Sequence, residues 1–355
     1  MCGFTVVRYK SQEKMNNNLK KKLLLCQKHR GPDHREFTES EGIYFFHNRL
    51  KIIDLSNDSN QPFISKKTGN IIVFNGEIYN YKYLRKKLSK RKFYTNSDTE
   101  VLLYLYEEKG EDFIKLLNGI FSFVIYDKKK DTLFSGRDRL GVKPLYYFKD
   151  KKKVIFSTEI KPILIIQRTK FNLEEVKSYI SSGNLYEDKF TFFNNIFIHD
   201  AANFSRLNLS NFKFFKKRYW ILKKEKSLIC KNYSQFYIKF INLMDHSLRL
   251  NLVGDVKVGL LYSSGTDSNF LRYFLQTKIN KRLKCFTFGW KEKKYDELQR
   301  LKNLKINTNK IQSITTEGSK ILKNLNKMIF MCEGPIGGFG IAALYDLFKI
   351  IKKKK

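Results

Sequence analysis

Short apolar runs bounded by charged turns recur through the first half of the chain. Clear examples span residues 71–74, 119–126 and 154–157. Their length and their content of aromatic and β-branched residues are typical of buried strands. The first half is therefore predicted to be rich in strands.

A strand, a polar loop and a helix are predicted in that order in the second half. The apolar run 257–262 precedes the small polar residues 263–268, and apolar residues then follow at helical spacing over 269–276. Amides of such a loop and the positive end of the helix dipole favour an anion, so this order predicts a phosphate cradle. The Walker pattern is absent. The run 285–290 is expected to form the next parallel strand.

Length and composition fit two domains. The chain has 355 residues and is 42% hydrophobic, which can fill two cores. Asn and Lys are frequent and periodicity is weak between about residues 190 and 235. We therefore expect domains at 1–190 and 236–355, joined by a connecting segment at 191–235.

Cys2 is the first candidate for chemistry. Once Met1 is removed, residue 2 carries both a thiol and a free α-amine. Their unperturbed pKa values are about 8.5 and 7.7–8.0, so the amine can take the thiol's proton directly or through water. Retained Met1 would turn that amine into an amide, which cannot act as the base.

Four short segments downstream suit the recognition of a small zwitterion: His29–Asp33, Asn48–Asp54, Phe74–Asn80 and Ser97–Glu100. Each also has a plain structural interpretation. Asn75-Gly76 is a common hairpin pair, and an Arg-Gly-Pro run is a normal loop signal.

Taken in order after Cys2, the four segments resemble the glutaminase domain of class II glutamine amidotransferases, in its asparagine synthetase branch. The resemblance continues through segments 118–123, 136–147 and 156–161, which in the family face an ammonia channel. It implies an α/β and α+β fold: an N-terminal αββα sandwich of the N-terminal-nucleophile type, then a partial doubly wound parallel-sheet domain.

The resemblance also implies roles for residues of the first domain. Cys2 matches the nucleophile, and Arg49 matches the arginine that holds the glutamine α-carboxylate. Asn75 and Gly76 match the oxyanion hole. The acidic residues around the substrate ammonium are matched by Glu77 and Asp98.

The polar loop of the second half resembles the S-G-G-x-D-S loop of ATP pyrophosphatases, which implies ATP and Mg²⁺. The implied ATP-binding residues are Tyr262, Ser263, Ser264, Gly265, Asp267, Ser268 and Phe288, with Asp267 near the metal. Ser264 stands where the family usually has glycine. If that position needs a left-handed backbone, serine costs roughly 1–2 kcal/mol and ATP affinity is in doubt.

The synthetase half is expected to be truncated. The family continues past an acid-x-proline segment, matched by Glu333-Gly334-Pro335, into a G-x-G-A-D-E loop, whereas this chain stops at Lys355. A fragment, a decayed synthetase, or a protein completed by a separate chain would all give this picture. A homodimer stays open as well.

A formal net charge of +35, from 69 Lys plus Arg against 34 Asp plus Glu, favours nonspecific attraction to nucleic acid or anionic membranes. The lysines are spread along the whole chain without a groove-reading motif, so no specific nucleic-acid partner is expected. No apolar stretch approaches the length of a membrane span, and the chain starts with the motif rather than a signal peptide. A cytoplasmic, membrane-free protein with reduced cysteines is expected.

The function implied is that of a glutamine-dependent asparagine synthetase. Glutamine would be hydrolysed at Cys2, and its ammonia transferred to an ATP-adenylated aspartate to give asparagine, glutamate, AMP and pyrophosphate. One alternative is a glutaminase remnant or subunit with an incomplete synthetase half. In another, the stretch 333–338 resembles polysaccharide-locus members of the family, whose acceptor would be a sugar carboxylate.

Overall fold

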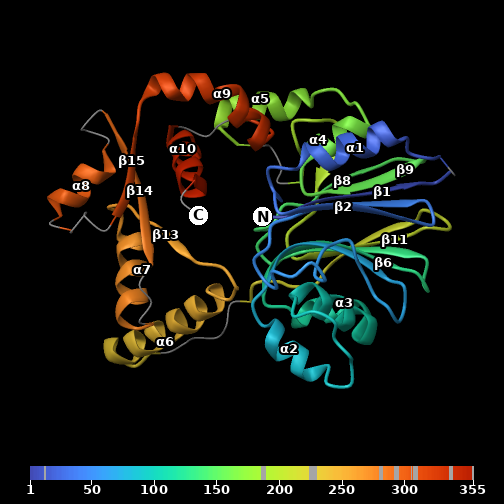
Figure 1. Cartoon of the computed structure of the whole chain (residues 1–355), viewed down its shortest axis with the longest axis horizontal. Helices are drawn as coiled ribbons and strands as arrows, with labels where there is room; N and C mark the ends of the chain where they lie inside the picture. Colours follow the sequence, from blue (N-terminus) through green and yellow to red (C-terminus); the bar gives the residue numbers. More distant parts are fainter. Residues whose placement is uncertain are drawn as a thin grey trace. The chain divides into compact units, whose positions relative to one another are not determined.

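A computed structural model describes the chain as two compact units, Met1–Leu228 and Ile229–Lys355 (Figure 1). The described residues are 1–11, 13–184, 189–223, 230–279, 283–291, 296–304, 306, 311–335 and 339–353.

Two six-stranded antiparallel sheets form the frame of the first unit. The first sheet has the order β10-β8-β9-β1-β3-β2 and the second β12-β11-β7-β6-β5-β4. The strands are β1 Gly3–Tyr9, β2 His34–Ser40, β3 Ile43–Arg49, β4 Phe63–Ile64, β5 Ile71–Ile78, β6 Gly119–Asp127, β7 Thr132–Arg137, β8 Tyr146–Lys149, β9 Lys153–Ser157, β10 Ile196–Ile198, β11 Asn203–Asn208 and β12 Phe214–Arg218. The three strand-like runs of the sequence are β5, β6 and β9.

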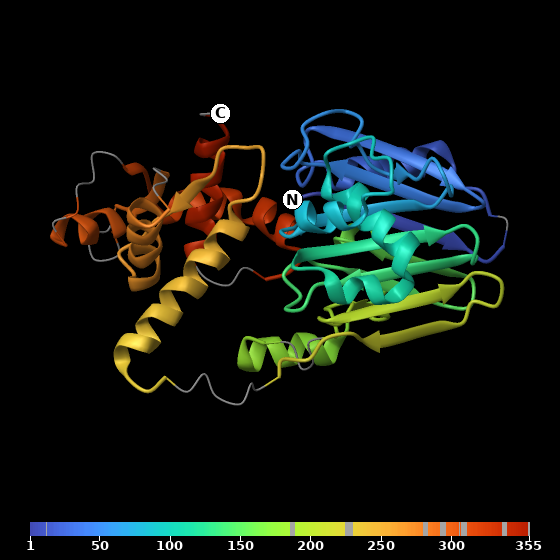
Figure 2. The same ribbon diagram turned by 90° about the horizontal axis from the view of Figure 1, so that it is seen from below.

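Helices cover the outer face of each sheet. Against the first sheet lie α1 (Asn17–Cys26) and α4 (Ile160–Ile166), whereas α2 (Tyr81–Lys87), α3 (Asp98–Lys109) and the 3-10 helix η1 (Gly110–Leu116) lie over the second. Figure 2 is seen from the side of α2 and α3 and shows these helices across the second sheet. A further helix, α5, spans Leu173–Ser182.

Alternation of side chains along the strands explains this layering. In β3, Ile43 and Phe45 belong to the core between the sheets, and Tyr44 and Phe46 belong to the core that packs on α1 and α4. All four are buried. A strand with both faces apolar must be covered on both sides, and the predicted αββα sandwich is confirmed.

The segment 191–235 was expected to connect the domains, but much of it belongs to the first unit. Strand β10 pairs with β8, and β11 pairs with both β7 and β12. These short strands lie at or next to the sheet edges, where charged residues such as Lys216 and Lys217 are tolerated. The same charges hide the strand pattern in the sequence.

The second unit is built on a parallel sheet of order β13-β14-β15, which agrees with the predicted fold class. Its elements are α6 Tyr233–Asn251, β13 Gly259–Leu261, α7 Thr266–Thr277, β14 Lys284–Trp290, α8 Glu297–Asn303, β15 Ile311–Thr316, α9 Gly318–Cys332 and α10 Phe339–Lys353. The strand predicted at 257–262 is β13, and the helix after the polar loop begins at Thr266, three residues earlier than predicted. Within the described residues, none of the helices has the length and apolar character needed to cross a membrane.

Candidate active site

Cys2 lies just before β1, where two of the predicted segments hold it in place. The Leu50 amide lies 3.4 Å from Cys2 Sγ, and Sγ lies 3.7 Å from the Leu50 carbonyl oxygen. Arg30 Nε donates to the Cys2 carbonyl at 2.9 Å. Gly31 allows this approach, since a Cβ there would lie 2.1 Å from the Asn48 carbonyl. The segments around residues 30 and 50 therefore position the nucleophile.

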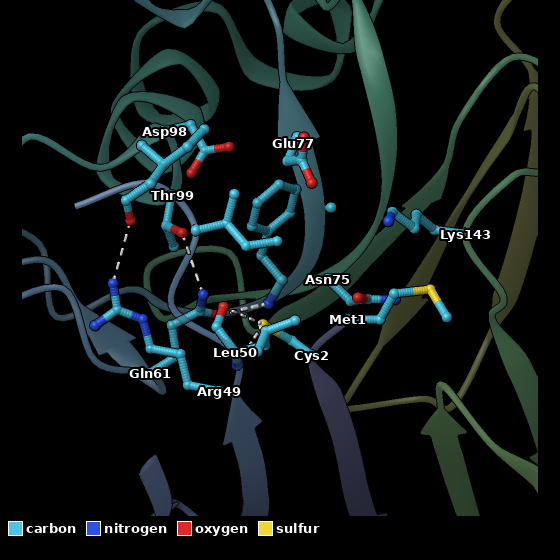
Figure 3. A pocket seen from close by; sticks show the side chains of 14 residues that line it. Met1, Cys2, Arg49, Leu50, Gln61, Asn75, Glu77, Asp98, Thr99 and Lys143 are labelled. Atoms are coloured by element: carbon cyan, nitrogen blue, oxygen red, sulfur yellow. Dashed lines mark hydrogen bonds between the residues drawn. The ribbon is translucent and has the colours of Figure 1, made fainter. Parts of the chain in front are cut away.

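Cys2 lines a small pocket (Figure 3). The six glutaminase residues predicted from the sequence all line it: Cys2, Arg49, Asn75, Gly76, Glu77 and Asp98. The sequence analysis assigned no site role to the other lining residues, which are Met1, Leu50, Ile52, Ile53, Gln61, Phe74, Thr99 and Lys143. The available signal for Lys143 was its place in the segment 136–147, which carries part of the family resemblance.

Asn75 and Gly76 lie inside β5 and pair with β6, so the hairpin interpretation is wrong. The Asn75 side chain is fully buried, and neither its Nδ2 nor its Oδ1 has a hydrogen-bond partner. A buried amide without partners is costly unless a ligand supplies them. A Cβ on Gly76 would lie 2.2 Å from the Ile120 carbonyl oxygen, so glycine is required there.

Arg49 ends β3 and uses its guanidinium to hold the loop that follows. Its Nη atoms donate to the Ser56 carbonyl at 2.7 Å, to Asn60 Oδ1 at 2.8 Å, and to the carbonyls of Ile53 and Asp54. Four of the five N–H donors are thus engaged, and Nε remains. A bidentate grip on a carboxylate requires some of these bonds to rearrange.

Asp98 begins α3, and its carboxylate accepts the Ile78 amide at 3.0 Å. Burial raises the pKa of Asp98 to about 7, and the nearby Glu77 carboxylate also raises it. Below that pH Asp98 is largely neutral. Its attraction for a substrate ammonium is then weaker.

Replacing Asp98 by asparagine is therefore expected to remove a pH dependence of glutamine binding. In the unmodified protein the KM for glutamine should rise about tenfold between pH 8 and pH 6, because protonation of Asp98 removes the charge that pairs with the substrate ammonium. In Asp98→Asn the KM should be high and flat. Initial rates of glutamate release measure this, with the exposed Asp112→Asn as control. A KM in Asp98→Asn that still varies tenfold would contradict the assignment.

Burial also affects the ionisable groups at the N-terminus. The α-amine at Met1 has a pKa lowered to about 6, mainly by desolvation. Burial raises the pKa of the Cys2 thiol. Removal of Met1 would place the α-amine on Cys2 itself, beside the thiol.

In the second unit, the predicted phosphate loop connects β13 to α7 and is closed by its own side chains. Ser268 Oγ accepts the Ser263 amide at 3.1 Å and donates to the Ser263 carbonyl at 2.8 Å. Ser263 Oγ accepts the Gly265 amide at 3.3 Å. These bonds fold the loop over the N-terminus of α7.

The φ angle of Ser264 is not positive, so serine in place of glycine causes no left-handed backbone strain at this position. Its amide and hydroxyl both donate to Glu297 Oε2, at 2.9 and 2.8 Å. The loop therefore already binds a carboxylate from the first turn of α8. Serine in place of glycine adds one donor to that contact.

The remaining predicted ATP residues lie around this loop. Tyr262 is buried and its hydroxyl bonds Asn269 Oδ1 at 2.5 Å, whereas Phe288 is half-buried in β14. Asp267 is exposed in the first turn of α7. Within the described ranges no three His, Cys, Asp or Glu side chains gather into a metal site. Residues 336–338 of the stretch 333–338 lie outside the described residues.

Comparisons with known proteins agree with both halves. A family model described as a glutamine amidotransferase domain matches residues 1–220, and one described as asparagine synthase matches residues 239–355. Bacillus subtilis (strain 168) has three similar proteins named asparagine synthetase (glutamine-hydrolyzing). Asparagine synthetase 2 is 35% identical over 262 residues, which are 70% of this chain and 35% of that protein. Asparagine synthetase 3 is 34% identical over 281 residues, which are 76% of this chain and 44% of that protein. Asparagine synthetase 1 is 28% identical over 364 residues, which are 99% of this chain and 56% of that protein.

The chain thus spans between about a third and three fifths of the length of these relatives. Both family matches follow the order of the two units, the amidotransferase domain first. The chain belongs to the family of glutamine-hydrolysing asparagine synthetases.

Proposed function

We propose that the first unit hydrolyses glutamine at Cys2. The observation that carries this proposal is the shared pocket, in which a thiol, an unpartnered buried amide and two carboxyl groups face one space. Thiol and amide suit attack on the side-chain amide of glutamine, and the carboxyl groups suit its ammonium. The pocket is lined by both cationic and acidic side chains, which suits a zwitterion.

The steps follow from the groups present. The α-amine of Cys2 takes the thiol proton, the sulfur attacks the amide carbon, and the amide nitrogen leaves as ammonia with that proton. Asn75 Nδ2 and the Gly76 amide donate to the oxygen that becomes negative. Water then hydrolyses the thioester to glutamate and restores the thiol.

We further propose that the second unit binds ATP and Mg²⁺ at the loop Ser263–Ser268. The fit rests on the Glu297 carboxylate, which shows that this loop donates to an anion. ATP would activate an acceptor carboxylate by adenylation, and Mg²⁺ would balance phosphate charge. Because Mg²⁺ keeps several waters and phosphate oxygens as ligands, the single carboxylate of Asp267 is compatible with it.

Aspartate is the proposed acceptor, with asparagine, glutamate, AMP and pyrophosphate as products of the whole reaction. The names of the similar proteins support this choice. A sugar carboxylate is the second acceptor to test. A glutaminase that supplies ammonia to another chain is the alternative from a different class, and it needs only the first unit.

The deciding experiment supplies ammonium directly and so bypasses the glutaminase. The chain is incubated with ATP, Mg²⁺, aspartate and ammonium, and AMP formation is measured with and without aspartate. AMP that depends on aspartate is the expected result. Glutamine hydrolysis without any AMP would reject the synthetase proposal for this chain and favour the glutaminase.

A further inference from the structure

Lys143 enters the glutaminase pocket from the loop between β7 and β8, 141 residues after the nucleophile in the sequence. Its side chain is only 7% exposed. Figure 3 shows its amine end turned toward the space between Glu77 and Asn75.

A rigid backbone holds Lys143 in this place. The Asp138 carboxylate is buried and accepts four amides, those of Phe121, Leu140, Val142 and Lys143, at 2.9–3.2 Å. Arg137 Nε donates to the Lys143 carbonyl at 2.8 Å. These hydrogen bonds fix the backbone of the loop and therefore the position from which the Lys143 side chain extends.

The Lys143 ammonium is not used in an ion pair. No acceptor among the described residues makes a hydrogen bond or an ion pair with its Nζ, although the Glu77 carboxylate is near enough to favour its charge. The fold therefore holds a cation in the pocket of Cys2 without a structural contact that would explain it, which suits a functional role.

Several charged groups interact with Cys2 or with the adjacent N-terminal amine: Arg30, Arg49, Lys143, Glu77 and Asp98. Among them Arg49 lowers the pKa of the Cys2 thiol and Asp98 raises it. The two arginines are already engaged, Arg30 with the Cys2 carbonyl and Glu159, and Arg49 with the carbonyls of its own loop. Burial lowers the pKa of Lys143, whereas Glu77 and Cys2 raise it. Its charge is thus coupled to the nucleophile.

We propose, as an extension of the proposed glutaminase function, that Lys143 is a positioning residue for Cys2: its charge favours the thiolate over the thiol. A nearby cation stabilises an anion and disfavours a second cation. Before the reaction the same charge keeps the N-terminal amine unprotonated, so the amine can accept the proton that leaves Sγ, and the electron pair stays on sulfur as the thiolate. Lys143 thereby lowers the pH at which Cys2 becomes reactive.

The test follows alkylation of Cys2 by iodoacetamide, in which an S–C bond forms and iodide leaves. It uses the full chain without glutamine, after mass spectrometry has confirmed removal of Met1, from pH 5.5 to 9.5. Lys143→Met should raise the midpoint by about one pH unit and slow the reaction at pH 7 about tenfold. Lys143→Arg keeps the charge and should keep the midpoint. The exposed Lys21→Met is the matched control.

Thermal melting separates this role from a structural one. Because the Lys143 ammonium makes no hydrogen bond or ion pair within the described residues, Lys143→Met should leave the melting temperature nearly unchanged, whereas loss of a structural lysine would lower it. Alkylation profiles of Lys143→Met that superimpose on those of the unmodified protein would overturn the proposal. If Lys143→Met fails to fold, Lys143→Gln is judged by the same midpoint.

Alkylation needs no turnover, so the two proposals fail separately. A shifted midpoint in a chain that releases no glutamate supports the role of Lys143 and rejects the glutaminase. An unshifted midpoint in a chain that releases glutamate rejects the role of Lys143 and supports the glutaminase.

Discussion

Cys2→Ala should reduce glutamate release from glutamine by roughly four orders of magnitude or more, to the background of the assay. Alanine keeps the N-terminal amine and removes only the sulfur that attacks the amide carbon. Glutamine binding should survive, because the charged lining residues are unchanged. Glutamate release under saturating glutamine is the measurement.

The exposed Cys332→Ala is the matched control, since it removes a thiol from the second unit. It should leave glutamate release unchanged. If Cys2→Ala released glutamate as fast as this control, the nucleophile would have to be another group.

Asn75→Ala has the second largest expected effect. Loss of one oxyanion donor costs about 2.7–4 kcal/mol of transition-state stabilisation, or about 10²–10³ in kcat. The KM for glutamine should change little, because the negative charge exists only in the transition state and the intermediate. Steady-state kinetics of glutamate release separate the two parameters.

Asn70→Ala is the control for truncating a buried asparagine of the first unit outside the pocket. Asn70 precedes β5, and its side chain has partners, since it donates to Glu107 and accepts from the Lys128 amide. Its loss should lower stability and leave kcat near that of the unmodified chain. An Asn75→Ala variant with a normal kcat and a raised KM would instead show that Asn75 binds the ground state.

Stability distinguishes the two asparagines further. Because the Asn75 amide has no hydrogen bond to lose, its truncation should destabilise the first unit less than that of Asn70. An unpartnered buried amide that also lines the pocket of Cys2 supports a role for Asn75 in binding a ligand.

The local pattern of apolar residues was sufficient to predict the strands β5, β6 and β9. It also predicted the order of β13, the polar loop and α7, because the spacing of apolar residues directly reflects which faces are buried. It was misleading for Asn75-Gly76. This pair has strong turn propensity, yet β5 continues through it, since ladder pairing with β6 outweighs a local preference.

The strands β11 and β12, next to and at the edge of the second sheet, were missed for a related reason. Their polar and charged residues weaken the hydrophobic signal, and pairing decides their state, because β11 pairs with β7 and β12 pairs with β11. Sequence reasoning also missed the partners of Ser264 and Arg49. A contact such as Ser264 with Glu297 joins residues 33 positions apart, which no local pattern reports.

The sequence by itself determined the chemical groups available for catalysis, the alternation that makes a strand-rich sandwich, and the strand–loop–helix of the second unit. Tertiary structure alone decided that residues between 1 and 143 share one pocket, that Lys143 is among them, and that burial sets the protonation of Asp98. The reason is physical: side-chain spacing along an element follows from backbone geometry, whereas proximity and desolvation depend on how distant elements pack.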